Sequence, residues 1–226
     1  EASTFLAYVV LTKDSTFAGE NYGILGLSWS KTSLALDGHR MAVDLHPDTR
    51  FFMVNTEVTG GGGIVVSNGV LRLGYVTQNT PGVNAPDVTL ELVNSTLWLD
   101  ADSTFGTYIP AATAVTNQVV EGTVLTLTRG FKPCDNAQLV PCKLLSGTVL
   151  DFSACTQTVP GEQLSFEAGA QIDIEVGSRT CHTGEVLMSW TEKPAGITFK
   201  RLGRGTPVWA TEEGLVVGTG TMIIFR

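Results

Sequence analysis

Length, composition and charge already limit what this chain can be. It has 226 residues, only 16% of them charged, and its formal net charge is −8, so a nucleic-acid-binding role is not expected. Its apolar runs are far shorter than the roughly 20 residues that a membrane-spanning helix needs, so no such helix is expected either.

Residues 1–32 open the chain with an apolar run over 5–11. Thr, Val and Gly are the most frequent residue types of the whole chain, and this composition favours β-strands joined by tight turns. The first unit of a stacked repeat is usually atypical because it covers an open end of the core. We therefore interpret residues 1–32 as an N-terminal cap made of strands.

One short pattern recurs along residues 33–184. Its clearest copies are EGTVLTL at 121–127 and SGTVLDF at 146–152, and looser copies include NGVLRL at 68–73 and NSTLWL at 94–99. Each copy begins with a small corner residue that follows a short apolar segment. The corner residues are Gly38, Gly69, Ser95, Gly122, Gly147 and Gly169, which follow one another at intervals of 22 to 31 residues. We assign one such corner to each turn of a repeat.

After each corner the residues alternate between apolar and polar, as in a strand with one buried face. In the copy at 94–99, this alternation places Leu97 and Leu99 inside and Trp98 outside. We expect the equivalent apolar residues to line one interior and to stack from turn to turn, so that Leu97 and Leu125 share a sheet. The expected interior residues are Leu71, Leu73, Leu97, Leu99, Leu125, Leu127, Leu150, Phe152, Ile172 and Ile174.

A unit of strand, corner and strand cannot bury its apolar side alone, whereas a stack of such units builds one continuous core. The sequence therefore predicts an all-β, right-handed parallel β-helix, or β-solenoid, of about six turns over 33–184. Residues 1–32 and 185–226 form its caps. A β-sandwich or jelly roll is the alternative, because it also has short strands at regular intervals.

The pattern of apolar residue, corner Gly, Thr and Leu-x-Leu resembles the repeats of bacterial autotransporter passenger regions and related surface β-helix proteins. LALDGHRMAVDL at 34–45 and GGGGIVVSNGVLRLG at 60–74 carry the resemblance best, and it covers roughly residues 33–175. The resemblance implies an extracellular or cell-surface location. It bears on fold and location more than on activity.

Four cysteines, Cys134, Cys142, Cys155 and Cys181, lie in the second half of the chain. In an acidic, Thr-rich chain we expect them to form disulfides, which implies an oxidising compartment. Three pairings are open, and we favour Cys134 with Cys142 and Cys155 with Cys181 because both close short local loops. A zinc site that includes His182 is the alternative, but no Cys-x-x-Cys spacing supports it. We expect no bound metal or cofactor.

The candidate binding site follows from the alternation at 94–99. If the alternation continues past the strand, Trp98, Asp100 and Asp102 lie together on the outer face of one turn. An indole beside carboxylates can stack on a sugar and hydrogen-bond to it, so these three are our candidate glycan-binding residues. Carboxylates two residues apart on a strand also lie about 7 Å from each other, near the separation that inverting glycosidases use. Glycan cleavage is therefore one alternative to glycan binding. The other is that residues 100–103 are a polar turn after the strand and that Trp98 packs on a neighbouring loop.

The remaining features favour a protein that does not catalyse a reaction. None of the three histidines, His39, His46 and His182, lies in a motif typical of a catalytic triad. The chain ends with an apolar segment over 222–225 that either caps the stack or pairs with a neighbouring molecule by strand addition. We expect a non-enzymatic spacer, adhesin or filament subunit, with a carbohydrate-binding module or a polysaccharide-active enzyme as the alternatives.

Overall fold

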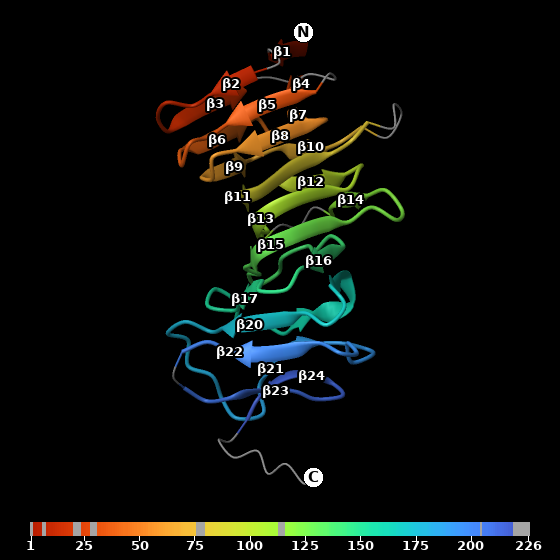
Figure 1. Ribbon diagram of the computed structural model, residues 1–226. Helices are drawn as coiled ribbons and strands as arrows, with labels where there is room; N and C mark the ends of the chain where they lie inside the picture. The colour runs from red at the N-terminus through yellow and green to blue at the C-terminus, as the bar shows by residue number, and fades with distance from the viewer. Residues whose placement is uncertain are drawn as a thin grey trace.

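The computed structural model describes residues 2–5, 8–19, 24–27, 31–75, 80–112, 116–203 and 205–218. The chain forms an all-β parallel β-solenoid of about seven turns, which confirms the predicted fold class. The turns stack from the N-terminal to the C-terminal end of an elongated molecule (Figure 1). In the described ranges the only helix is the short 3-10 segment η2 (Gly161–Gln163), and no helix there could cross a membrane.

A six-stranded sheet forms the first side of the solenoid, which we call face A. All of its strands are parallel, and each pairs with a strand of the next turn. Its strands, in order, are β1 (Ala2–Phe5), β4 (Ile24–Leu27), β7 (Arg50–Met53), β10 (Val70–Leu73), β12 (Thr96–Leu99) and β14 (Gln118–Val119).

A fourteen-stranded sheet bends to form the second and third sides, faces B and C. Face B holds β2 (Tyr8–Val10), β5 (Thr32–Ala35), β8 (Thr56–Thr59), β16 (Cys142–Leu144) and β19 (Leu164–Phe166). Face C holds β3 (Ser15–Gly19), β6 (Arg40–Leu45), β9 (Gly63–Ser67), β17 (Val149–Asp151), β20 (Gln171–Glu175) and β22 (Thr198–Arg201).

Three longer strands run through the bend and join faces B and C. They are β11 (Val83–Val93), β13 (Ser103–Ile109) and β15 (Leu125–Phe131). The first residues of β11 pair with β8 on face B, and its last residues pair with β9 on face C. Strand β11 therefore belongs to both faces. The register between β11 and β13 shifts between Ala85 and Thr89, where the sheet turns from one side to the other.

The two ends of the chain differ. At the N-terminal end, β1 pairs with β4 and β2 pairs with β5, so these strands continue the parallel stacking. At the C-terminal end a four-stranded sheet contains β18 (Val159–Pro160), β21 (Val186–Ser189), β24 (Gly214–Val217) and β23 (Val208–Ala210). Strand β24 is antiparallel to both of its neighbours, which interrupts the parallel stacking. The apolar segment at 222–225 lies outside the described residues.

One apolar core runs through the stack. All ten residues that we expected to line the interior have no exposed surface, and all ten belong to a single cluster of buried side chains. Burial of apolar surface is the main favourable contribution to folding. Because the cluster continues through successive turns, each turn is stabilised by those next to it.

The stacking differs from our alignment of the repeats in one respect. Leu71 pairs with Leu97 across face A, as expected, but Leu125 lies on face B, where it pairs with Ser103. The expectation that Leu97 and Leu125 share a sheet is therefore wrong, although both side chains point into the same core.

The repeated pattern marks three different corners of the turn, which explains this error. Gly69 and Ser95 precede strands of face A, whereas Gly122 precedes a strand of face B. Gly38, Gly147 and Gly169 each lie between a strand of face B and a strand of face C. Every corner of the turn needs a small residue, and every strand after a corner has alternate side chains that point into the core. The pattern alone therefore does not show which corner it marks.

Two of these glycines meet different demands. Gly122 has a φ of +81°, and nothing lies within 4 Å of the position its Cβ would take, so its backbone conformation is what favours glycine there. At the corner that contains Gly69, it is the preceding residue, Asn68, that has a positive φ, of 66°. A Cβ on Gly69 would lie 2.7 Å from the Leu45 side chain, so this glycine permits close packing between turns.

Truncation of one interior side chain tests the shared core. We expect Leu97→Ala to lower the free energy of unfolding by about 2–5 kcal/mol, because it leaves a cavity in the stack. Val93→Ala is the matched control, since Val93 is 39% exposed and its loss should cost little. Urea denaturation of both variants measures the difference, and equal losses would contradict a continuous core at Leu97.

Candidate functional site

Trp98 lies on face A within a row of stacked side chains. On the paired strands β7, β10 and β12, Phe52, Arg72 and Trp98 occupy the same register position. The guanidinium carbon of Arg72 lies 5.3 Å from the centre of the Trp98 ring system, and that of Arg50 lies 4.4 Å from it. Both arginines are in the range of cation–π attraction. Trp98 is half-buried and engaged by two guanidinium groups.

Asp100 is the charged partner of Arg72. The Nε of Arg72 donates a hydrogen bond to Oδ2 of Asp100 at 2.5 Å, and both side chains are largely buried, 12% and 7% exposed. Arg72 also lies 4.5 Å from the ring centre of Tyr75. The aromatic rings and the carboxylate thus surround one guanidinium, whose planar shape suits both contacts.

Asp102 has a different role in the turn. Its Oδ1 accepts a hydrogen bond from the backbone N–H of Val124 in the next turn, at 2.8 Å. Strand β12 ends at Leu99, so residues 100–102 form a turn and the alternation does not continue through them. Trp98 and Asp100 both contact Arg72, whereas the Asp102 side chain is bound to Val124, so the strand alternation on which the grouping rested ends before Asp102.

The turn at 100–102 borders two neighbouring hollows. One has a volume of about 550 Å³ and is lined by Asp100, Asp102 and Glu121 among others, and the other has a volume of about 370 Å³ and is lined by Lys31 and Glu57 among others. Both share a wall made by Pro81, Gly82 and Asp102. We call the two hollows together the corner groove. The structure thus brings Asp100 and Asp102 to one hollow, while Trp98 lies outside its lining.

Gly82 allows the wall of the corner groove to form. A Cβ at this position would lie 2.2 Å from Oγ of Ser103 and 2.4 Å from the carbonyl oxygen of Asp102. The backbone N–H of Val83 donates to the same Ser103 hydroxyl at 3.1 Å. Close approach of these two chain segments therefore requires glycine.

Polar side chains of the outer row of face B line the smaller hollow of the corner groove. Glu57, Asn84 and Thr104 pair in register on β8, β11 and β13. Glu57 also forms an ion pair with Lys31, at 3.2 Å. The groove therefore offers carboxylate, amide, hydroxyl and ammonium groups, which can hydrogen-bond to a hydroxyl-rich ligand. In the described part of the chain no three His, Cys, Asp or Glu side chains are arranged to hold a metal ion.

Removal of the Arg72 side chain tests the buried ion pair. We expect Arg72→Ala to lower the free energy of unfolding by about 3–5 kcal/mol, because it leaves the carboxylate of Asp100 buried without this partner. Arg40→Ala is the control, since Arg40 is 56% exposed and lies 3.7 Å from Glu91, and exposed ion pairs contribute about 1 kcal/mol or less. Guanidinium chloride denaturation measures the free energy of unfolding of both variants. An equally small loss of stability for Arg72→Ala and Arg40→Ala would contradict a buried ion pair between Arg72 and Asp100.

The four cysteines are all free thiols in the structure, so neither expected disulfide is present. Cys142 is 1% exposed and points into the core from β16, whereas the thiol of Cys134 donates to the carbonyl oxygen of Pro110 at 3.3 Å. The thiol of Cys155 donates to the carbonyl oxygen of Gln157 at 3.2 Å. The expected pairs are close in sequence, but the solenoid directs their thiols to different neighbours.

Asp135 links two successive turns of this region through several hydrogen bonds. Its carboxylate accepts hydrogen bonds from the backbone N–H groups of Thr156 and Gln157, at 2.6 and 2.8 Å, and from the Thr156 hydroxyl at 2.5 Å. The hydrogen bond from the Thr156 side chain and those from the backbone lower the pKa of Asp135 to about 2. Hydrogen bonds of this kind favour the charged form of a carboxyl group.

This lowered pKa predicts a pH dependence of stability. The ordinary pKa is 3.8, so the contribution of the carboxylate is complete above about pH 4 and is lost as the pH falls through about 2. We expect the difference in urea midpoint between the wild type and Asp135→Asn to be largest above pH 4 and to shrink toward pH 2. A difference that stays constant between pH 5 and pH 2 would contradict the assigned hydrogen bonds.

The sequence reading missed Arg50, Arg72 and Asp135. Each acts on a residue of another turn, and no local motif marks such a partner. A correct assignment of registers between turns would have placed Arg72 beside Trp98, because both occupy the third position of a four-residue strand on face A.

Comparisons with known proteins add nothing to this picture, since no family model, no curated protein and no solved structure matches the chain.

Proposed function

We propose that this protein is a non-enzymatic structural spacer of an extracellular or cell-surface assembly. One observation carries the proposal: about seven turns share a single apolar core that runs the length of the stack. Because each turn packs only on its neighbours, the length of such a molecule increases with the number of turns. The Thr- and Gly-rich, acidic composition and the resemblance to surface β-helix repeats support the location.

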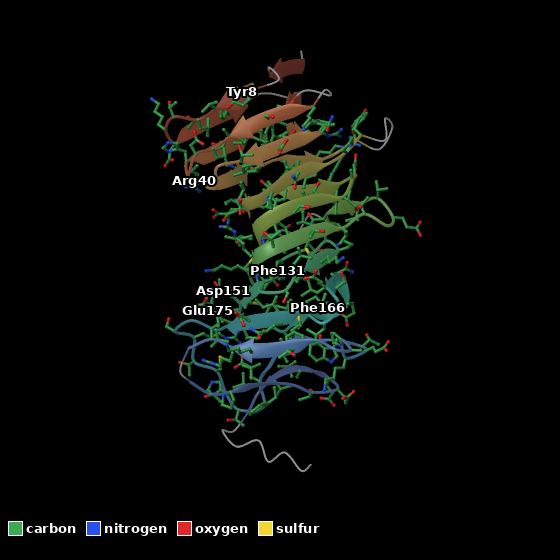
Figure 2. The ribbon with its side chains drawn as sticks, viewed as in Figure 1. Tyr8, Arg40, Phe131, Asp151, Phe166 and Glu175 are labelled. Atoms are coloured by element: carbon green, nitrogen blue, oxygen red, sulfur yellow. The ribbon has the colours of Figure 1, made fainter. Side chains whose placement is uncertain are left out.

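The proposal includes association of one molecule with another through the N-terminal end of the stack. Strand β2 is the last strand of its sheet in the described residues, pairing with β5 on one side. Tyr8 and Val10 on this strand are 66% and 41% exposed, and Tyr8 lies near the N-terminal end of the molecule (Figure 2). An edge strand has free N–H and C=O groups that can pair with a strand of another molecule, and exposed apolar side chains favour such pairing.

Charge on the β2 edge tests this association. We expect the wild type to form end-to-end oligomers at high protein concentration and the double variant Tyr8→Lys, Val10→Lys to associate roughly tenfold more weakly, because lysines on an edge strand oppose pairing. Val93→Lys is the control, since Val93 is exposed on β11, away from the ends. Sedimentation velocity measures the association of the wild type and of both variants, and negative-stain electron microscopy shows whether the oligomers are joined end to end.

Equal association of the wild type and the double variant would contradict pairing through β2. A wild type that stays monomeric over the whole concentration range would contradict self-association altogether. A compact particle in small-angle X-ray scattering, rather than an elongated one, would contradict the spacer role.

The corner groove supports glycan binding as a second candidate function. The observation in its favour is the row of Glu57, Asn84 and Thr104, which lines one of two hollows that share a wall. Trp98 contributes little to this proposal, because its ring already contacts Arg50 and Arg72. The groove rather than the indole is the proposed contact with sugar hydroxyls.

A polysaccharide panel tests this second function. We expect Asp102→Asn to weaken glycan binding about tenfold or more, because a charge-assisted hydrogen bond is lost while an oxygen remains to accept from Val124. Glu192→Gln, an exposed change of equal charge outside the groove, should leave binding unaltered. No binding to any glycan would contradict this function, and release of reducing ends that Asp100→Asn or Asp102→Asn abolishes would contradict the non-enzymatic assignment.

A further inference from the structure

Two cysteines of successive turns lie beside each other in the second half of the solenoid. The loop at 134–137 stacks on the loop at 155–158. Hydrogen bonds from Thr156 and Gln157 to Asp135 join the two loops, and these residues are 21 and 22 positions from Asp135 in the sequence. The backbone N–H of Asn136 also donates to the side chain of Gln157, 21 positions on. The same offset of 21 positions separates Cys134 from Cys155.

Both cysteines line one small hollow. Its volume is about 70 Å³, and Pro133, Val159 and Pro160 contribute to the same wall. Cys155 is 2% exposed, and Cys134 is half-buried. Cys134 and Cys155 lie in loops of neighbouring turns. The paired strands of such turns lie about 4.8 Å apart, and this spacing is within the 4.4–6.8 Å range of Cα separations in disulfides.

The other two cysteines have different surroundings. Cys142 lies in the core between strands of face B, where it pairs in register with Leu125 and Leu164. The residue that contacts the backbone of Cys155 from the following turn is Arg179, whose guanidinium donates to the Cys155 carbonyl oxygen. Cys181 lies two residues beyond that contact, and its Sγ is 3.9 Å from the carbonyl oxygen of Arg179.

We propose that Cys134 and Cys155 are an inter-turn redox pair, which an oxidised low-molecular-weight disulfide converts to a disulfide bond that joins two successive turns of the solenoid. This pairing differs from the one favoured by the sequence, which joined Cys134 to Cys142 and Cys155 to Cys181. The proposed redox pair does not depend on the spacer role or on glycan binding in the corner groove.

The reaction is a thiol–disulfide exchange in two steps. The thiolate of one cysteine attacks a sulfur of the small disulfide, forms a mixed disulfide and releases one small thiol. The thiolate of the other cysteine then attacks the protein sulfur of that mixed disulfide and releases the second small thiol. The two protein thiols lose two protons and two electrons in total, and the small disulfide takes up both.

The surroundings make this exchange slow near neutral pH. Burial and the neighbouring Asp135 raise the pKa of both thiols, that of Cys155 to about 11. The reacting species is the thiolate, so little of either thiol is reactive at pH 7. Small thiols should reduce the disulfide slowly, because Cys155 is 2% exposed.

The test is oxidation of the purified full chain with oxidised glutathione at pH 8.5, followed by non-reducing peptide mapping. We expect a peptide that links Cys134 to Cys155 and a rise of roughly 5–10 °C in the midpoint of thermal unfolding, because closing a loop of about 20 residues restricts the unfolded chain. Reduction with dithiothreitol should reverse both changes.

Matched variants separate this pair from its competitors. Cys134→Ala should lose both the linked peptide and the thermal shift, whereas Cys181→Ala should keep both. A link between Cys155 and Cys181, a link between Cys134 and Cys142, or glutathione adducts without any internal link would each overturn the proposal. The mapping of the wild type decides the question even if a variant fails to fold.

Discussion

Parallel pairing between equivalent strands of successive turns is the constraint on which the rest of this structure depends. It stacks Leu71 on Leu97 in the core of face A, and by the same register it stacks Arg72 on Trp98 outside. A strand alternates its side chains between two faces, so one pairing register determines both the apolar core and the outer surface. A shift of one residue would place the leucines in solvent and the arginine in the core.

The polar interactions of the molecule follow the same geometry. Arg72 pairs with Asp100, Asp102 accepts from Val124, and Asp135 accepts from Thr156 and Gln157, each across one turn. Most of these side chains lie in or next to corners. Backbone N–H groups in a corner are not hydrogen-bonded to a neighbouring strand, so they need other acceptors. Side-chain carboxylates supply those acceptors and link the corners of neighbouring turns.

The spacer role that we propose would use the length of this scaffold. The corners provide positions where side chains from successive turns meet. The corner groove and the hollow between Cys134 and Cys155 both lie between loops of successive turns. Binding or covalent chemistry at such places would act on the contact between turns, which is also what stabilises the fold.

The β-solenoid and its core could be predicted from the sequence, because apolar alternation and small corner residues are local properties. All ten positions predicted from the alternation, from Leu71 to Ile174, are buried. The corner that each copy of the repeat occupies could not be predicted, since Gly69, Gly122 and Gly147 have similar neighbours in sequence but lie at different corners of the turn. The partners of Trp98, Asp100 and Cys155 also depend on register between turns. That register results from the packing of whole turns, so residues some twenty positions apart become neighbours without any local signal.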